Sequence, residues 1–492
     1  MAVSPTIRPT PGAGLNWLVL LIIAGVAGWL RTHELSRRPM HADEANQAVK
    51  AGELLESGHY AFDPQDHHGP TLYYAVLPMA WSRGEHSLAA LSETTVRLVP
   101  ALFGTVAVIL LGLLARPMGH GPALLAAALL ATSPPAVYYS RYFIQETLLS
   151  AFFLGALLCA QRWWRQGGKL AAGGVGLCLG LMQATKASTP LFVAAALLAL
   201  ALARPSRPVS TRIFRDLLFV LVTALVVSVV LYSSLGRNFA GLKDAIEVYT
   251  HTWQRVNTGA GHEKPWWYYL QLFTWQKNGG LVWQQIPFVT LALAGLVAAM
   301  YSPANKLLRW SAGLTVLLVV LLSLSPYKTP WHAVHFVPGG ALLAAGAMST
   351  WARTPTRQLV ALIMAGFVLW SLLTQTRLTA FQRPADARNP YAYVHTSPDM
   401  LKLRGLVETA LQRFPDQPVR IVSEEYWPMP WYLRGLPRVG YWTTAPDECD
   451  GALIIASAGQ AEAVQARLHG KYQLAYLGLR PGFVCVVFTP EP

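Results

Sequence analysis

Eleven long apolar runs, separated by short polar segments, constrain the fold of this chain more than any other feature. The runs are long enough to cross most of a bilayer's hydrocarbon core, singly or as tight hairpins. Only 13% of the residues are charged and the mean hydropathy is +0.34, more apolar surface than a soluble fold could bury. We therefore predict a polytopic α-helical membrane protein with about 11 transmembrane helices. The runs begin near Leu15, Leu98, Gly121, Thr147, Leu170, Pro190, Leu217, Leu281, Trp310, Ala333 and Gln358.

Two of these runs need a choice between alternatives. Residues 170–203 could form one long helix or two short helices that turn at Thr185–Pro190; basic residues at both ends favour the hairpin. The first run is predicted to be a membrane helix and not a cleaved secretory signal. Three arginines follow it directly, and no small-residue cleavage site does.

The positive charge is distributed in a way that predicts the topology. A net charge of +14 could suit nucleic acid, but the basic residues lie in short clusters between apolar runs, so no nucleic-acid partner is expected. The clusters fall on every second loop between the apolar runs. The short loops on the opposite side of the membrane hold only Arg141, Lys186 and Lys328. The positive-inside rule then places the N-terminus in the cytoplasm and the C-terminus outside. We expect an integral protein of a bacterial inner or plasma membrane. The clusters comprise Arg8, Arg116, Arg162, Arg165, Lys169, Arg204, Arg207, Arg212, Arg215, Lys306, Arg309, Arg353 and Arg357.

The chain is predicted to have two parts. Residues 1–376 form the membrane domain, with long outer loops at residues 31–96 and 236–280. Residues 377–492 contain alternating strand-like and helix-like runs, which predict a small extracytoplasmic α/β domain. Its two cysteines, Cys449 and Cys485, could form a disulfide in an oxidising compartment, and the sequence leaves this open.

The interiors of the apolar runs carry no Asp, Glu, Lys or Arg, and their one ionisable group is His335. A proton- or ion-coupled transporter usually needs such groups at mid-membrane. The pattern therefore favours an enzyme that works at the outer membrane surface. The alternatives are a flippase for lipid-linked saccharide, a flippase accessory without transferase activity, and a noncatalytic scaffold.

A pair of carboxylates stands at the beginning of the first outer loop. Asp43 and Glu44 follow His41 a few residues after the first apolar run. Such a group provides a base that can take a proton from an acceptor hydroxyl, with a neighbour that orients it or raises its pKa. The alternative interpretation makes Asp43 a solvated cap of a helix over Glu44–Leu55.

Here the sequence resembles membrane glycosyltransferases with the GT-C fold. The Asp43-Glu44 pair looks like the Asp-Glu pair of glycosyltransferase family 39, which includes protein O-mannosyltransferases and lipid A aminoarabinose transferases. Within that superfamily the chain looks closest to the flippase-activity-associated glycosyltransferases. The stretches that carry the resemblance, in chain order, are Met40–Ala45, His68–Tyr74, Arg97–Gly104, Tyr139–Glu146, Ala184–Lys186, Lys328–Trp331, His335–Pro338 and Tyr426–Arg434.

The resemblance implies that a sugar moves from a polyprenyl phosphate to a protein, lipid or glycan acceptor, with inversion at the anomeric carbon. Asp43 would be the base. The lipid phosphate needs fixed cations, for which Arg141, Lys186 and Lys328 are the candidates, unless they only anchor the helices at the interface. Where the family often places a lysine before Pro-Pro, this chain has His68-Gly69-Pro70, so His68 is the candidate at that phosphate contact.

Further residues complete the predicted site. No cofactor is expected with certainty, but histidine and carboxylate side chains together suit a divalent metal ion. No pair shows the spacing of a zinc-binding helix, so this is the weaker alternative. Candidate substrate contacts are His41, Tyr73, Arg97, Glu146, His332 and His335; the residues of the metal alternative are His41, Glu44, His67 and His68.

Overall fold

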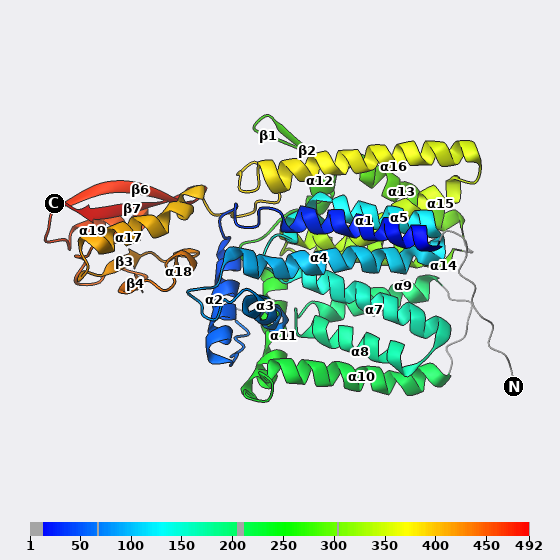
Figure 1. Cartoon of the computed structure of the whole chain (residues 1–492), viewed down its shortest axis with the longest axis horizontal. Coiled ribbons are helices and arrows are strands. Elements are labelled where there is room, and N and C mark those ends of the chain that lie inside the picture. The colour runs from blue at the N-terminus through cyan, green and yellow to red at the C-terminus, as the bar shows by residue number, and fades with distance from the viewer. Residues whose placement is uncertain (1–12, 66–67, 204–210, 303–304, 492) are drawn as a thin grey trace.

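The computed structural model describes residues 13–65, 68–203, 211–302 and 305–491. Each of the eleven apolar runs contributes a helix, and these helices lie side by side along the long axis of the molecule (Figure 1). Among the described residues, six helices are long and apolar enough to cross a membrane, and four apolar helices are shorter. Eleven membrane crossings remain a prediction. The helices are α1 (Ala13–Thr32), α4 (Glu93–Ala115), α5 (His120–Thr132), α7 (Glu146–Gln166), α8 (Lys169–Gln183), α9 (Thr189–Ala203), α10 (Thr211–Tyr232), α13 (Ile286–Tyr301), α14 (Lys306–Leu324), α15 (Val337–Trp351) and α16 (Pro355–Thr376).

Two predicted boundaries can be compared with the structure. Residues 170–203 form two helices, α8 and α9, that turn between Ala184 and Ser188, as the hairpin interpretation predicted. The run predicted from Leu281 begins with a short strand, and its helix starts only at Ile286. Arg8, Arg204 and Arg207, which contributed to the topology prediction, lie outside the described residues.

Small residues let neighbouring helices of the bundle approach closely. A Cβ atom at Gly295 of α13 would lie 1.9 Å from the Leu343 carbonyl oxygen of α15, and one at Gly180 of α8 would lie 2.6 Å from the Ala224 carbonyl oxygen of α10. Any larger side chain would push these helices apart. Such contacts are typical of helix packing in membranes, where dispersion replaces the hydrophobic effect.

Shorter elements connect the helices. In Figure 1, α2, α3 and α11 gather at the end of the bundle that faces the C-terminal part. Most polar residues predicted to be functional belong to this end or to the loops that reach it. The connecting elements are α2 (Ala42–Ser57), α3 (Thr71–Ser82), η1 (Arg116–Met118), α6 (Pro134–Tyr139), α11 (Ala240–Thr258), α12 (Tyr268–Phe273), β1 (Trp275–Asn278), β2 (Leu281–Gln284), η2 (Pro330–His335) and η3 (Arg377–Gln382).

The C-terminal part contains a five-stranded sheet with the order β4-β3-β5-β7-β6. Strand β3 pairs in parallel with β4 and β5, whereas β7 pairs antiparallel with β5 and β6. Cys449 and Cys485 are buried as free thiols, so the disulfide that the sequence left open is absent from this structure. The elements are η4 (Pro398–Lys402), α17 (Leu403–Arg413), β3 (Val419–Val422), α18 (Met429–Tyr432), β4 (Val439–Trp442), β5 (Leu453–Ser457), α19 (Ala458–Gln465), β6 (Tyr472–Arg480) and β7 (Phe483–Pro490).

Specific hydrogen bonds join this C-terminal part to the first outer loop. The Tyr432 hydroxyl accepts a hydrogen bond from the Met40 amide at 2.8 Å, and Thr396 donates to the Met40 carbonyl at 2.6 Å. Arg434 donates to the Leu91 carbonyl from two nitrogens, at 3.1 and 2.8 Å. These bonds bring the segment before Thr396 against the Asp43 region.

Candidate functional site

The backbone around Asp43 is set by the first turn of α2. His41 is the N-cap of the helix: its Nδ1 accepts a hydrogen bond from the Asp43 amide at 3.1 Å. Glu44 completes a capping box by accepting from the His41 amide at 3.0 Å. The interpretation of Asp43 as the helix cap is therefore wrong. Its side chain stays 52% exposed and is free for chemistry.

Glu44 occupies a different environment although it is the next residue. Its carboxylate is fully buried and pairs with Arg38 at 2.9 Å and with the Arg97 Nε at 2.9 Å. It also accepts from the Phe143 amide at 2.9 Å. Burial by itself would raise the pKa of Glu44, but the two guanidinium groups and these hydrogen bonds lower it to about 2. Because both oxygens are bonded and buried, this geometry does not fit Glu44 as a metal ligand or as a base in contact with substrate.

Three residues that the sequence did not single out lie near enough for the charge of Asp43 to act on them. They are His262, after α11, Tyr327, after α14, and Tyr393, in the C-terminal part. The Tyr393 hydroxyl lies 2.9 Å from His262 Nδ1. The backbone carbonyl oxygen of Tyr393 lies 3.0 Å from His41 Nε2. The His262 and Tyr327 rings are 4.9 Å apart. Sequence reasoning could have found His262 from its place in the second outer loop, but Tyr393 carries no local signal.

The charge of Asp43 acts on these neighbours. Burial raises the pKa of Tyr327 to about 12, and the nearby Asp43 carboxylate adds to the increase. Burial lowers the pKa of His262, and Asp43 opposes that change. Lys264 and Arg255 also act on His262, so the Asp43 carboxylate shares this region with both aromatic and cationic side chains.

A second group of polar residues gathers around Lys186. Its ammonium donates a hydrogen bond to Glu146 and interacts electrostatically with His332 and His335. His68 interacts with His332 in the same way. The Nδ1 of His335 is buried and has no hydrogen-bond partner among the residues that the structure describes. The structure thus brings together five predicted residues from four distant parts of the sequence.

Tyr327 connects the two groups. The negative charges of both Asp43 and Glu146 act on its hydroxyl, and its ring lies 6.3 Å from the His332 ring. Asp43 and the Lys186–Glu146 pair are therefore parts of one polar region at the same end of the bundle.

The remaining predicted residues have other surroundings. Arg141 donates to the carbonyls of Leu30 at 3.2 Å and Glu34 at 3.2 Å, away from Lys186. Lys328 is buried, donates to the carbonyls of Lys264 and Ser325, and has its pKa lowered by burial. Their proposed contact with the donor phosphate stays a prediction.

Two further predicted residues also have defined partners. Arg97 is buried against Glu44, and Tyr73 is hydrogen-bonded to Gln47. In the part of the chain that the structure describes, no group of three or more His, Cys, Asp or Glu residues could hold a metal ion. His67, part of the metal alternative, lies outside the described residues.

Comparison with known proteins places this geometry in a structural class. Residues 79–233 match the family model described as dolichyl-phosphate-mannose-protein mannosyltransferase. ArnT from Cupriavidus metallidurans in the apo state is similar over 96% of this chain and 98% of ArnT, with a TM-score of 0.66 and 14% identity. Its structure bound to undecaprenyl phosphate is similar over 98% of both chains, with a TM-score of 0.65 and 15% identity.

A third structure has the same fold in a longer chain. The oligosaccharyltransferase AglB from Archaeoglobus fulgidus, in complex with an inhibitory peptide and a dolichol-phosphate, is similar over 85% of this chain and 63% of AglB. The TM-score is 0.55 and the identity is 15%. No curated protein sequence matches the chain. At these identities the likeness shows the fold, which is the membrane fold of GT-C glycosyltransferases.

Proposed function

We propose, from the GT-C membrane fold that the chain shares with these glycosyltransferases, that it is an inverting glycosyltransferase with a polyprenyl-phosphate sugar donor. The acceptor is a hydroxyl group of an envelope protein, lipid or glycan at the outer face of the membrane. The observation that carries this proposal is the position of Tyr327. The negative charges of Asp43 and Glu146 both act on its hydroxyl. This position supports the proposal that a proton acceptor, Asp43, and a cation paired with Glu146, Lys186, serve one site.

In the proposed reaction, the acceptor oxygen attacks the anomeric carbon from the face opposite the phosphate. The bond between that carbon and the phosphate oxygen breaks, and its electron pair remains on the lipid phosphate. The acceptor proton passes to the Asp43 carboxylate. The half-exposed position of Asp43 supports this role, since an acceptor can reach it from solvent.

Glu44 is proposed to position the base without touching substrate. Its ion pairs with Arg38 and Arg97 and its bond to the His41 amide hold the first turn of α2 in place. The turn in turn sets the direction of Asp43. Rigid support of this kind keeps a catalytic group near its productive geometry.

Lys186 is proposed to hold the donor phosphate. In the structure its ammonium pairs with Glu146, so a bound phosphate would share or replace that partner. The adjoining His68 and His332 can donate hydrogen bonds to the remaining phosphate oxygens. A fixed cation stabilises the negative charge that the leaving phosphate gains in the transition state.

The test is transfer of radiolabelled sugar from polyprenyl phosphate in membranes that contain the protein. Asp43→Asn keeps the size of the side chain but removes the proton acceptor, so turnover should fall by about 10² to 10⁴ while donor binding survives. The matched control is Asp63→Asn, in the same loop and exposed, which should transfer at the wild-type rate. An Asp43→Asn protein with wild-type turnover would refute the assignment. A wild-type protein that moves lipid-linked sugar across the membrane but never transfers it would favour a flippase.

A further inference from the structure

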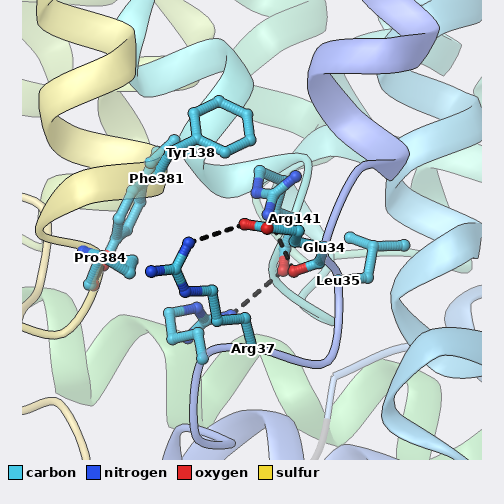
Figure 2. A pocket seen from close by; sticks show the side chains of 9 residues that line it. Glu34, Leu35, Arg37, Tyr138, Arg141, Phe381 and Pro384 are labelled. Carbon is cyan, nitrogen blue, oxygen red and sulfur yellow. Dashed lines mark hydrogen bonds and ion pairs between the residues drawn. The ribbon is translucent and has the colours of Figure 1, made fainter.

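A second pocket lies at the end of α1, and it shares Arg38 with the support of Glu44 in the proposed site. It is a shallow hollow open to solvent, and the space of about 340 Å³ between its atoms includes the solvent at its mouth. Figure 2 shows Glu34, Leu35 and Arg141 on one side, with Tyr138, Phe381 and Pro384 facing them. The pocket is lined by Glu34, Leu35, Arg37, Arg38, Tyr138, Arg141, Ala380, Phe381 and Pro384.

Positive charge is in excess around this pocket. Arg38 shares the single carboxylate of Glu44 with Arg97, and Arg37 pairs with Glu34 at 2.9 Å. The described partners of the Arg141 guanidinium are backbone carbonyls. The four guanidinium groups of Arg37, Arg38, Arg97 and Arg141 thus lie near two carboxylates, those of Glu34 and Glu44. Burial, together with the nearby charges of Arg38 and Arg97, lowers the pKa of Arg141 to about 9, so an added negative charge would offset repulsion among these guanidinium groups.

The surroundings of the pocket are those of a lipid headgroup site. Trp29, in the last turns of α1, is 57% exposed and stacks on His33 at 5.0 Å. The Phe381 ring lies 6.4 Å from Trp29 and also contacts the Arg141 guanidinium, 4.6 Å from its ring centre. Aromatic rings at the end of an apolar helix mark the interface of a bilayer.

Two apolar helix faces lead to the pocket. Helices α1 and α16, which end beside it, expose large apolar side chains along their lengths. Acyl chains can lie on such faces while a headgroup enters the pocket. The exposed side chains are Leu18, Leu21, Ile22, Val26, Leu359, Leu362, Ile363, Phe367 and Trp370.

We propose that this pocket binds the phosphate of an anionic membrane lipid. Arg37, whose side chain is 64% exposed, turns from Glu34 to the phosphate, and Arg141 and Arg38 supply the buried positive field. The site is separate from the Lys186 group. In Figure 1, α1 and α16 lie towards one edge of the bundle, and α8, which precedes Lys186, lies towards the other. A free phosphate ion would make no contact with the exposed apolar faces of α1 and α16, whereas the acyl chains of a lipid would. The ligand is therefore a lipid.

The test is lipid binding by the purified full-length protein in neutral detergent, measured by native mass spectrometry and by thermal shift. Phosphatidylglycerol should bind and raise the melting temperature, whereas phosphatidylcholine and inorganic phosphate at equal concentration should not. Arg37→Gln should weaken phosphatidylglycerol binding about tenfold, because it removes one charge-assisted contact. Glu34→Gln should strengthen the binding, since it removes the competing carboxylate. The matched control is Arg83→Gln, an exposed arginine of the same loop that pairs with Glu85.

Three results would overturn the proposal. The first is equal binding of phosphatidylglycerol and phosphatidylcholine. The second is unchanged phosphatidylglycerol binding by the Arg37→Gln protein. The third is stabilisation by inorganic phosphate as strong as by the lipid, with the same loss in Arg37→Gln, which would assign the pocket to a soluble anion. Both substitutions lie on exposed side chains, so the variants should fold.

Discussion

Asp43 and Glu44 are adjacent in the sequence, but the fold gives them opposite environments. The side chain of Asp43 is half exposed beside His262 and Tyr393, whereas Glu44 is buried between two arginines. The capping box explains the difference, since it turns Glu44 back towards the start of α2 and leaves Asp43 pointing away. The hypothesis of two paired carboxylates therefore divides into two roles. Asp43 is the candidate for the chemistry, and Glu44 is the candidate for positioning it.

Replacing Glu44 with Gln should destabilise the protein strongly, because Arg38 and Arg97 would lose their buried counter-charge. Breaking a buried ion pair typically costs about 3 to 5 kcal/mol. Glu53→Gln, on the same helix, removes only a surface pair with Lys50, worth about 0 to 1 kcal/mol. Melting temperatures of the two variants in detergent compare these effects. Equal melting temperatures would contradict the role of Glu44 as the support of this region.

The same residue predicts a pH dependence. The folded-state pKa of Glu44, about 2, lies below its ordinary value of 4.5. Its contribution to stability is thus complete above pH 4.5 and is lost as the pH falls through 2. The difference in melting temperature between wild type and Glu44→Gln should shrink between pH 6 and pH 2.5. A difference that stays constant over this range would mean that folding does not lower the pKa of Glu44.

Lys186 is the residue at which donor binding can be tested without disturbing the base. Lys186→Ala should raise the KM for the polyprenyl-phosphate donor about tenfold or more, because a charge-assisted contact is worth about 1.5 to 3 kcal/mol. The acceptor KM should change little. Lys402→Ala, an exposed lysine of the C-terminal part, serves as the control. An unchanged donor KM at normal protein levels would leave Lys186 as an interfacial anchor.

At the scale of elements, the segment between η3 and η4 matters most, because it carries Tyr393 to the Asp43 region. It is held by the bond between Thr396 and the Met40 carbonyl and by the contact between the Tyr393 carbonyl and His41. The C-terminal part therefore contributes to the candidate site. The sequence had predicted a small α/β domain packed on the outer face, without singling out Tyr393.

Arg434→Ala should loosen the attachment of this part to the membrane helices. The guanidinium stacks on Trp431 and donates to the Leu91 carbonyl, which precedes α4. Loss of these charged hydrogen bonds should cost about 1.5 to 3 kcal/mol. Limited trypsin digestion should then cut faster between residues 377 and 402 than in the control, Arg413→Ala. Identical digestion rates would mean that other contacts carry the attachment.

At the scale of the whole molecule, the topology is open to a direct test. Alternating basic loops predict a cytoplasmic N-terminus and, after eleven crossings, an outer C-terminus. A phosphatase reporter fused at the C-terminus should be active, because that enzyme needs the oxidising outer compartment, and a fluorescent reporter that folds only in the cytoplasm should be dark. The reverse pattern would contradict the predicted parity and would move the Asp43 region to the cytoplasmic side.

Much of this architecture follows from local patterns. Runs of apolar residues predicted where the bundle helices lie, and the alternating strand-like and helix-like runs of residues 377–492 predicted the mixture of strands and helices that is observed there. These predictions succeed because membrane insertion and strand burial depend on side chains within a single window of the chain. Asp43 could be singled out for the same reason, since its motif is continuous in sequence.

The assembly of the site depends on contacts that no local pattern records. His41 meets Tyr393 across 352 residues, and Arg97 reaches Glu44 across 53. Sequence reasoning placed Arg141, Lys186 and Lys328 together because all three lie in short outer loops. The packing of the helices decides instead which loops lie next to each other. As a result, Lys186 lies beside Glu146, whereas Arg141 lines the pocket at the end of α1. The sequence by itself determined the apolar helical bundle and the choice of Asp43 as the candidate base, because both depend on residues close together in the chain, whereas only the tertiary structure decided which charged groups lie together.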